Sequence, residues 1–343
     1  MMHISKGFYS ILTGLCVFSI MLAVQAESDR FSVTSHPEDG KTVWELHDKE
    51  SNSRVSILPD QGANCIRYRV GGKPILLEPA SVAALCKRPL DTGIPLMFPF
   101  SCGAGNAEIN FNGEVCRMRP NPTGPKIRSC GLIFRRPFRV IEAKGGTASA
   151  TLLCEINSNA DPVVAKEYLW PFRFQVRFTL DAAGLSCHYT MYNIGKKTAP
   201  VMFGIHPYFT GRGPVSIPAT HRYEFAENLS NGKKGPFDGR INGDMLLGDI
   251  NYGNADHFEC HIGSVLMRCS REFGFVNIYF PPGLSAVAVE PLIALPDAAN
   301  LRARGVTGTG LRELPPGESF TCQLRIEPEL LSPKEKGCVL NND

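Results

Sequence analysis

The chain has 343 residues, of which 43% are hydrophobic and 20% are charged, and its formal net charge is +3. This is ordinary globular composition with enough apolar residues to bury a sizeable core. The charges form no basic run or stripe, so the sequence excludes an electrostatic footprint for nucleic acid, and we expect no nucleic-acid partner.

The first segment, residues 1–26, predicts a signal peptide. Lys6 supplies a short positive region, an apolar run extends from Phe8 to Val24, and small residues at Val24 and Ala26 favour cleavage after Ala26. An uncleaved anchor is the alternative, but the run is short for a membrane-spanning helix, which needs about 20 apolar residues. We therefore expect an exported protein, periplasmic or secreted, without stable membrane insertion after cleavage.

Twelve cysteines are scattered along the chain, and eleven remain once Cys16 is removed with the signal. No C-x-x-C spacing occurs, so neither a zinc ribbon nor a redox motif is indicated. Export permits disulfides, but the sequence does not indicate their pairing. We expect most of these cysteines to be small buried side chains.

After the signal, short alternating runs rich in β-branched and aromatic residues predict strands, and Gly, Pro, Asn and Asp turns separate them. The predicted strands are 42–46, 54–58, 65–70, 74–77, 148–154, 172–180, 186–192, 201–205, 265–269, 276–280, 286–289 and 320–326.

Long amphipathic helical periods are missing, which disfavours a doubly wound α/β fold and favours a large antiparallel sandwich. We expect one all-β domain over residues 27–330 and a polar tail over residues 331–343. Residues 209–256 are the least regular part, and we expect long loops with small strands that carry a binding site.

The apolar stretch from Ala199 to Phe209 contains one histidine, His206. Val201, Phe203 and Ile205 alternate as in a buried strand, and Pro207 is expected to end the strand after His206. A histidine at the mouth of a buried strand is well placed to meet a ligand. The less specific interpretation is a hydrogen-bonded core histidine.

Four segments, in this order, resemble the aldose 1-epimerases (galactose mutarotase-like proteins): residues 93–100, the His-Pro-Tyr-Phe of 206–209, Val289-Glu290-Pro291 and Leu314 to Ser319. The resemblance implies a super-β-sandwich and cofactor-free interconversion of sugar anomers. It also implies that His206 donates a proton to the ring oxygen while Glu290 takes the proton of the anomeric hydroxyl.

The residue types fit this chemistry. Opening a hemiacetal needs one group that gives a proton and one that takes a proton. Histidine, with a pKa near ~6.5, donates or accepts near neutral pH, and glutamate, near ~4.3, is a base. The reaction needs no metal or cofactor, and we expect none. For Glu290, a structural ion pair is the alternative.

Cys130, Gly103 and Ala104 depart from the family pattern, and the aspartate of the family is assigned less directly. Cys130 stands where the family has a sugar-holding histidine, and Gly103 and Ala104 stand where a sugar-binding arginine is expected. Arg128 is a candidate substitute, as are Arg135 and Arg136. For the aspartate that holds sugar hydroxyls in the family, Asp256 is the candidate and Asp249 the alternative.

Other patterns suggest further sites. His257, Glu259 and His261 would share one strand face and offer metal-ligating atoms, although a solvated face is favoured. The arginines from 117 to 136 suggest phosphate recognition and a sugar-phosphate epimerase, which export disfavours. A Cys130–His206 dyad for acyl transfer is a minor alternative.

The sequence therefore predicts an aldose 1-epimerase-like isomerase acting on a small sugar. The first alternative is a non-catalytic carbohydrate-binding protein on the same fold. The second is a structural exported β-protein that binds no sugar.

Overall fold

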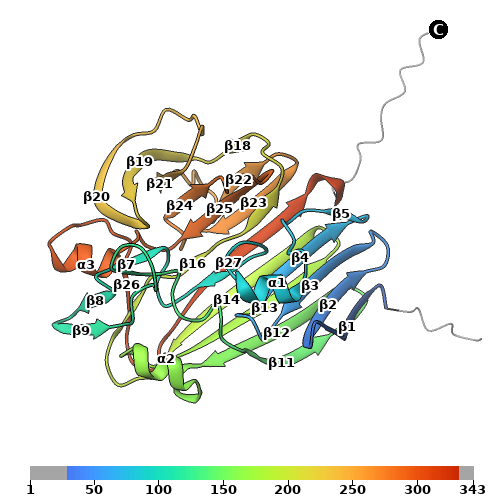
Figure 1. Cartoon of the computed structure of the whole chain (residues 1–343). Helices are drawn as coiled ribbons and strands as arrows, with labels where there is room; N and C mark the ends of the chain where they lie inside the picture. Colours follow the sequence, from blue (N-terminus) through green and yellow to red (C-terminus); the bar gives the residue numbers. More distant parts are fainter. Residues whose placement is uncertain (1–28, 332–343) are drawn as a thin grey trace, which may run out of the picture.

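The computed structural model describes residues 29–331 (Figure 1). The predicted signal peptide, residues 1–26, and the predicted tail beyond residue 331 lie outside the described residues. Within residues 29–331, no helix is long and apolar enough to cross a membrane.

Two eight-stranded sheets and one five-stranded sheet make up most of the structure, and the pairings between their strands are antiparallel. The five-stranded sheet contains, in order, β1 (Phe31–Glu38), β2 (Lys41–Asp48), β3 (Ser53–Leu58), β4 (Asn64–Val70) and β5 (Lys73–Pro74). It packs beside β12 and β13 of the first eight-stranded sheet. The predicted all-β fold is thereby confirmed.

The first eight-stranded sheet has the order β11 (Arg139–Lys144), β12 (Ser149–Asn157), β13 (Phe172–Asp181), β14 (Gly184–Asn193), β27 (Ser319–Pro328), β23 (Val265–Ser270), β22 (His257–Ile262) and β18 (Val215–Ser216). The second has the order β20 (Leu229–Pro236), β19 (Ala219–Ala226), β21 (Met245–Ile250), β24 (Phe275–Tyr279), β25 (Ala286–Leu292), β16 (Gly204–Ile205) and β6 (Leu96–Met97), and β17 (Tyr208–Thr210) also pairs with β25.

Three two-stranded ladders and short helices complete the described structure. The ladders are β7 (Gly103–Gly105) with β10 (Ile127–Ser129), β8 (Glu108–Phe111) with β9 (Glu114–Arg117), and β15 (Ala199–Val201) with β26 (Arg312–Leu314). The helices are α1 (Val82–Lys87), α2 (Pro162–Glu167) and α3 (Ala298–Ala303), with the 3₁₀ turns η1 (Ser158–Ala160) and η2 (Glu329–Leu331).

An aromatic core joins the two large sheets. Phe174 of β13 and Tyr189 of β14 place their rings 5.3 and 5.0 Å from the ring of Phe203, which directly precedes β16. Along β13, buried residues alternate with half-buried ones, as the period of two predicts for a strand with one covered face. All seven residues of β25 are buried, because this strand is central in its sheet.

Residues 209–256 contain more regular structure than the sequence predicts. β19 and β20 are eight-residue strands joined by Glu227 and Asn228, which both have positive φ. Two such residues form the tight turn whose twist matches a hairpin. β20 contains Asn-Gly-Lys-Lys-Gly and lies at the sheet edge, where charge and glycine are tolerated, so its composition resembles that of a loop.

The stretch around His206 is also not one continuous strand. β15 ends at Val201, β16 covers only Gly204 and Ile205, and β17 begins at Tyr208. Pro207 has no backbone N–H to donate and separates β16 from β17, as the sequence predicts. The separate predicted strand 74–77 is shorter than expected, since β5 includes only Lys73 and Pro74.

Candidate active site

The strand register brings His206 and Glu290 together. Gly204 of β16 lies opposite Leu292 of β25, and Tyr208 of β17 lies opposite Ala288. Counting inward from both pairs places His206 opposite Glu290. The backbone N–H of His206 donates to the Pro95 carbonyl at 3.0 Å, which fixes this segment between β25 and the chain before β6.

The two side chains meet on one face of the sheet. His206 Nε2 lies 3.2 Å from Glu290 Oε1, and the side chains are 11% and 2% exposed. On the other side of Glu290, Asn277 of β24 donates from Nδ2 to the same Oε1 at 2.9 Å. The Oδ1 of Asn277 and the Nδ1 of His206 are buried without a hydrogen-bond partner. Buried polar atoms of this kind are candidates for a bound ligand or water.

Burial shifts the pKa values of this pair in opposite directions. It lowers the pKa of His206 to about 3 and raises the pKa of Glu290 to about 8, because each charged form loses its hydration. The charge of Asp244 raises the pKa of Glu290 further, and the hydrogen bond from Asn277 opposes that rise. Near neutral pH the pair therefore holds one proton, on Glu290, while His206 is neutral.

A second row of side chains runs beside the pair. The Tyr208 ring stacks on the His206 ring with centroids 4.6 Å apart, and the Tyr279 ring approaches it edge-on at 6.4 Å. Met245 of β21 pairs with Ile278, so the preceding residue, Asp244, continues this row beyond Tyr279. Asp244 Oδ1 accepts the backbone N–H of Phe280 at 2.8 Å.

Asp244 is the site residue that sequence reasoning missed. Its charge raises the pKa values of both Glu290 and Tyr279, so it belongs to the electrostatic surroundings of the pair. The sequence signal was an acidic residue directly before the apolar run Met245-Leu246-Leu247. That pattern resembles many strand starts, which is why it did not single out Asp244.

The two aspartates considered from the sequence lie elsewhere. Asp256 precedes β22 in the other large sheet, its side chain is 97% exposed, and its Oδ1 lies 2.8 Å from His257 Nδ1. Asp249 forms ion pairs with His221 and Lys234. The structure therefore does not bring Asp256 or Asp249 to the His206–Glu290 pair.

A family model described as aldose 1-epimerase matches residues 43–232, a span that contains His206 and ends before Glu290. The chain belongs to the aldose 1-epimerase family. A comparison with curated protein sequences found no significant match.

Solved structures share the fold of this aldose 1-epimerase family member. A galactose mutarotase-like protein from Clostridium acetobutylicum is 17% identical, with 88% of this chain and 99% of that chain covered and a TM-score of 0.76. A galactose mutarotase-like protein from Lactobacillus casei is 16% identical over 86% and 99% of the chains, with a TM-score of 0.61. A galactose mutarotase related enzyme from Lactobacillus acidophilus is 17% identical over 80% and 94%, with a TM-score of 0.59.

Cys130, where the resemblance leads us to expect a histidine, lies near Glu290. It follows β10 with φ of 59°, and its N–H donates to the Cys102 carbonyl at 2.5 Å. Burial raises the pKa of the Cys130 thiol to about 12; the charge of Glu290 adds to this shift, and Arg128 opposes it. The thiol is therefore protonated near neutral pH, which disfavours a nucleophilic dyad with His206. Each of the ten cysteines in residues 29–331 is free.

Gly131 fixes the backbone at this point. Its φ is +72°, and a Cβ added there would lie 2.4 Å from the Phe98 carbonyl oxygen. Only glycine allows such an approach without a shift of the backbone. The Cys130 segment is thus held against Phe98, in one of the segments that resemble the family.

At Gly103, where the resemblance leads us to expect a sugar-binding arginine nearby, another part of the chain covers the backbone. A Cβ at Gly103 would lie 2.5 Å from the carbonyl oxygen of Asn228, at the tip of the β19–β20 hairpin. Arg128 does not replace the arginine directly, since its Nη1 donates to the Arg119 carbonyl at 3.3 Å and its Nη2 lies 3.9 Å from Glu167.

Residues of the other sites suggested by the sequence form ion pairs with neighbouring side chains. Arg119 pairs with Glu167 and Arg136 with Asp161, so the arginines do not converge on one anion site. Arg268 forms an ion pair with Glu259 beside His257, where a metal would have to bind. Among the described residues, no cluster of His, Cys, Asp and Glu side chains has the arrangement of a metal site.

Proposed function

We propose that this chain interconverts the α and β anomers of an aldose by acid–base ring opening and closure. The observation that carries the proposal is the 3.2 Å approach of His206 Nε2 to Glu290 Oε1 on one sheet face. Such a pair can give one proton and take another at neighbouring sugar oxygens. Membership of the aldose 1-epimerase family supports the same reaction.

The proton held by the pair defines the first step. Before a sugar binds, the proton resides on Glu290, because burial disfavours both the carboxylate and the imidazolium. Sugar hydroxyls that donate to the carboxylate would favour its ionised form and release the proton to His206 across 3.2 Å. The Tyr208 ring, stacked on His206, then stabilises the resulting imidazolium.

The chemical step follows from this charge distribution. Glu290 takes the proton of the anomeric hydroxyl, His206 gives its proton to the ring oxygen, and the bond between the anomeric carbon and the ring oxygen breaks. Rotation of the open aldehyde and the reverse proton transfers close the ring on the other face. Asn277 keeps the carboxylate oriented. Asp244 is the residue that we assign to sugar hydroxyls.

The test is exchange between anomers, measured by polarimetry and by NMR saturation transfer on a panel of freshly dissolved aldoses. Acceleration over the spontaneous rate is the expected result. A panel without acceleration for any aldose would refute the proposal.

A second candidate, a non-catalytic carbohydrate-binding protein, is favoured by two observations. Cys130 cannot supply the charge of the family histidine, and the hairpin tip covers Gly103 where an arginine would bind sugar. Calorimetric titration separates the two functions. Sugar binding without acceleration supports the binding protein, whereas acceleration that Glu290→Gln abolishes supports the isomerase.

Export to the periplasm or the medium is part of the same proposal and rests on the sequence of residues 1–26. Expression of the full chain followed by fractionation and N-terminal sequencing tests it. A mature chain that starts at Glu27 is expected, and an intracellular chain that keeps residue 1 would contradict it.

A further inference from the structure

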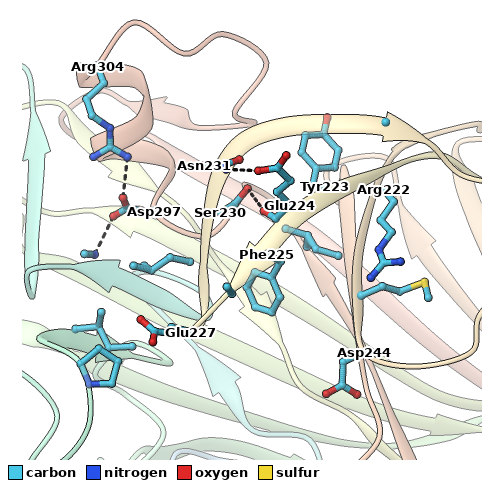
Figure 2. Close-up of a pocket in the computed structure, with 18 of the residues that line it drawn as sticks. Arg222, Tyr223, Glu224, Phe225, Glu227, Ser230, Asn231, Asp244, Asp297 and Arg304 are labelled. Carbon is cyan, nitrogen blue, oxygen red and sulfur yellow. Dashed lines mark hydrogen bonds and ion pairs between the residues drawn. The ribbon is translucent and has the colours of Figure 1, made fainter.

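An open cavity lies beside the candidate active site, over β19, β20 and β21 (Figure 2). Its volume is about 1040 Å³. One wall is the β19–β20 hairpin, another is the segment Pro125 to Ile127 with Gly105 and Asn106, and α3 contributes its N-terminal neighbour Asp297 and its C-terminal neighbour Arg304. The family assignment does not account for this space.

Part of the cavity lining lies on the same sheet face as the His206–Glu290 pair. Glu290 pairs with Asn277, and Asn277 pairs with Leu246, so these three residues form a row across β25, β24 and β21. Leu246 and Asp244 line the cavity. Asp244 is close enough to Glu290 to raise the pKa of that carboxyl. Asp244 therefore belongs both to the cavity lining and to the surroundings of the pair, and the lining strand β21 lies two strands away from Glu290.

The size of the cavity indicates more than one sugar unit. Pockets that enclose a drug-sized ligand measure about 300–1,000 Å³, and a single hexose is smaller than such a ligand. A cavity of about 1040 Å³ beside the pair has room for further units attached to the reacting ring.

The lining suits a neutral, hydroxyl-rich chain. Phe225 is half-buried and presents its ring to the cavity, as Figure 2 shows, and an aromatic face packs well against the C–H face of a sugar. Exposed Arg222 and Glu227 offer donors and acceptors to hydroxyls. Acidic and basic side chains are mixed, and Asp297 pairs with Arg304 at 3.2 Å, so the lining does not select a highly charged ligand.

We propose that the substrate of this site is the reducing end of a neutral oligosaccharide. The reducing ring lies at His206 and Glu290, and the following units lie along the cavity, with Phe225 as a stacking platform. This inference rests on the proposed anomer exchange, and it replaces a free monosaccharide by a longer glycan as the preferred substrate.

The experiment compares monosaccharides with trisaccharides that end in the same reducing sugar. Glucose is measured with maltotriose and cellotriose, xylose with xylotriose, and mannose with mannotriose, each by NMR anomer exchange. We expect at least one trisaccharide to exceed its monosaccharide about 10-fold in kcat/KM, mainly through a lower KM.

Phe225→Leu keeps an apolar side chain and removes the aromatic face, which should reduce the trisaccharide advantage about 2- to 10-fold and leave the monosaccharide rate unchanged. Lys233→Ala, exposed on the same hairpin and outside the cavity lining, is the matched control. An equal loss for both substrate sizes in Phe225→Leu would overturn the role of Phe225.

The outcomes separate this inference from the proposed function. Exchange of monosaccharides without any trisaccharide advantage overturns the oligosaccharide substrate and keeps the isomerase. If the anomers of no sugar are exchanged, calorimetry with the same trisaccharides tests whether the cavity binds glycans. Binding that Phe225→Leu weakens then supports the cavity as a glycan site, and no binding by any trisaccharide overturns it.

Discussion

His206 Nε2 lies 3.2 Å from Glu290 Oε1, and the contact exists because β25 pairs with the two short strands on either side of His206. The two residues come from distant parts of the chain, and their separation depends on strand register alone. A shift by one residue would turn one of the side chains to the opposite face. The register of β25 with β16 and β17 therefore fixes the contact between His206 and Glu290.

Removing either member of the pair should abolish anomer exchange. In Glu290→Gln the base is lost while the shape is kept, and in His206→Ala the acid is lost. General acid–base catalysis typically contributes about 10²–10⁴-fold, so we expect kcat to fall by at least ~10² in each variant. Asp256→Asn, at an exposed position in the other sheet, is the control and should retain the wild-type rate.

The pH dependence of kcat/KM should show at which pH His206 and Glu290 lose the proton that they share. The pKa of Glu290 is raised to about 8, so above this pH the free enzyme loses the one proton that the mechanism needs. We expect kcat/KM to decline as the pH rises through about 8 in a buffer series measured by NMR. A profile that continues to rise beyond this pH would argue against a shared proton.

The same carboxyl should make the fold less stable at alkaline pH. Glu290 has a folded pKa of about 8 and an ordinary value of 4.5. Between these values the folded state binds the proton more strongly than the unfolded state, so stability falls as the pH rises and levels off above about 8. His206, with its pKa lowered to about 3, contributes the opposite slope below its ordinary value of 6.5.

Thermal melts of the wild type and of Glu290→Gln test this pH dependence of stability. From pH 6.5 to 8 the Tm of the wild type should fall more than that of Glu290→Gln, because glutamine does not ionise. Parallel curves for the two proteins would contradict the raised pKa of Glu290.

Asp244 rather than Asp256 should affect the reaction. Asp244→Asn removes a charged partner for sugar hydroxyls, and one such hydrogen bond is worth about 1.5–3 kcal/mol, so KM should rise roughly 10- to 100-fold. The lost negative charge should also lower the pKa of Glu290 and move the alkaline limb of the pH profile to lower pH. Unchanged KM and an unchanged limb would place Asp244 outside the site.

Cys130 should tolerate serine and benefit from histidine. Its thiol is protonated at neutral pH, so Cys130→Ser should keep the rate if the thiol is no nucleophile. Cys130→His introduces beside Glu290 the histidine that the resemblance leads us to expect, and a new donor at a developing charge can add up to about 10²-fold in kcat. Histidine is also among the residues that occur at positive φ. Inactivation by serine would instead indicate thiol chemistry.

Much of the fold followed from local patterns. Buried and half-buried residues alternate along β13 and along most of β14 and β27, and a sequence with one covered face shows this period of two. β19 and β20 were not predicted individually within residues 209–256, because main-chain pairing of β19 with β20 and β21 holds them, while Gly and Lys in the edge strand β20 bury few side chains. Local composition carries no information on such pairing.

The sequence by itself determined the all-β class and two residues able to exchange protons, His206 and Glu290, because residue type and order suffice for both. Only the tertiary structure decided their 3.2 Å contact, the choice of Asp244 over Asp256, and the cavity beside them. The physical reason is register. Strand pairing places Glu290, Asn277 and Leu246 in one row, whereas Asp256 leads into a strand of the other sheet. Spacing along the chain does not reveal which strands pair.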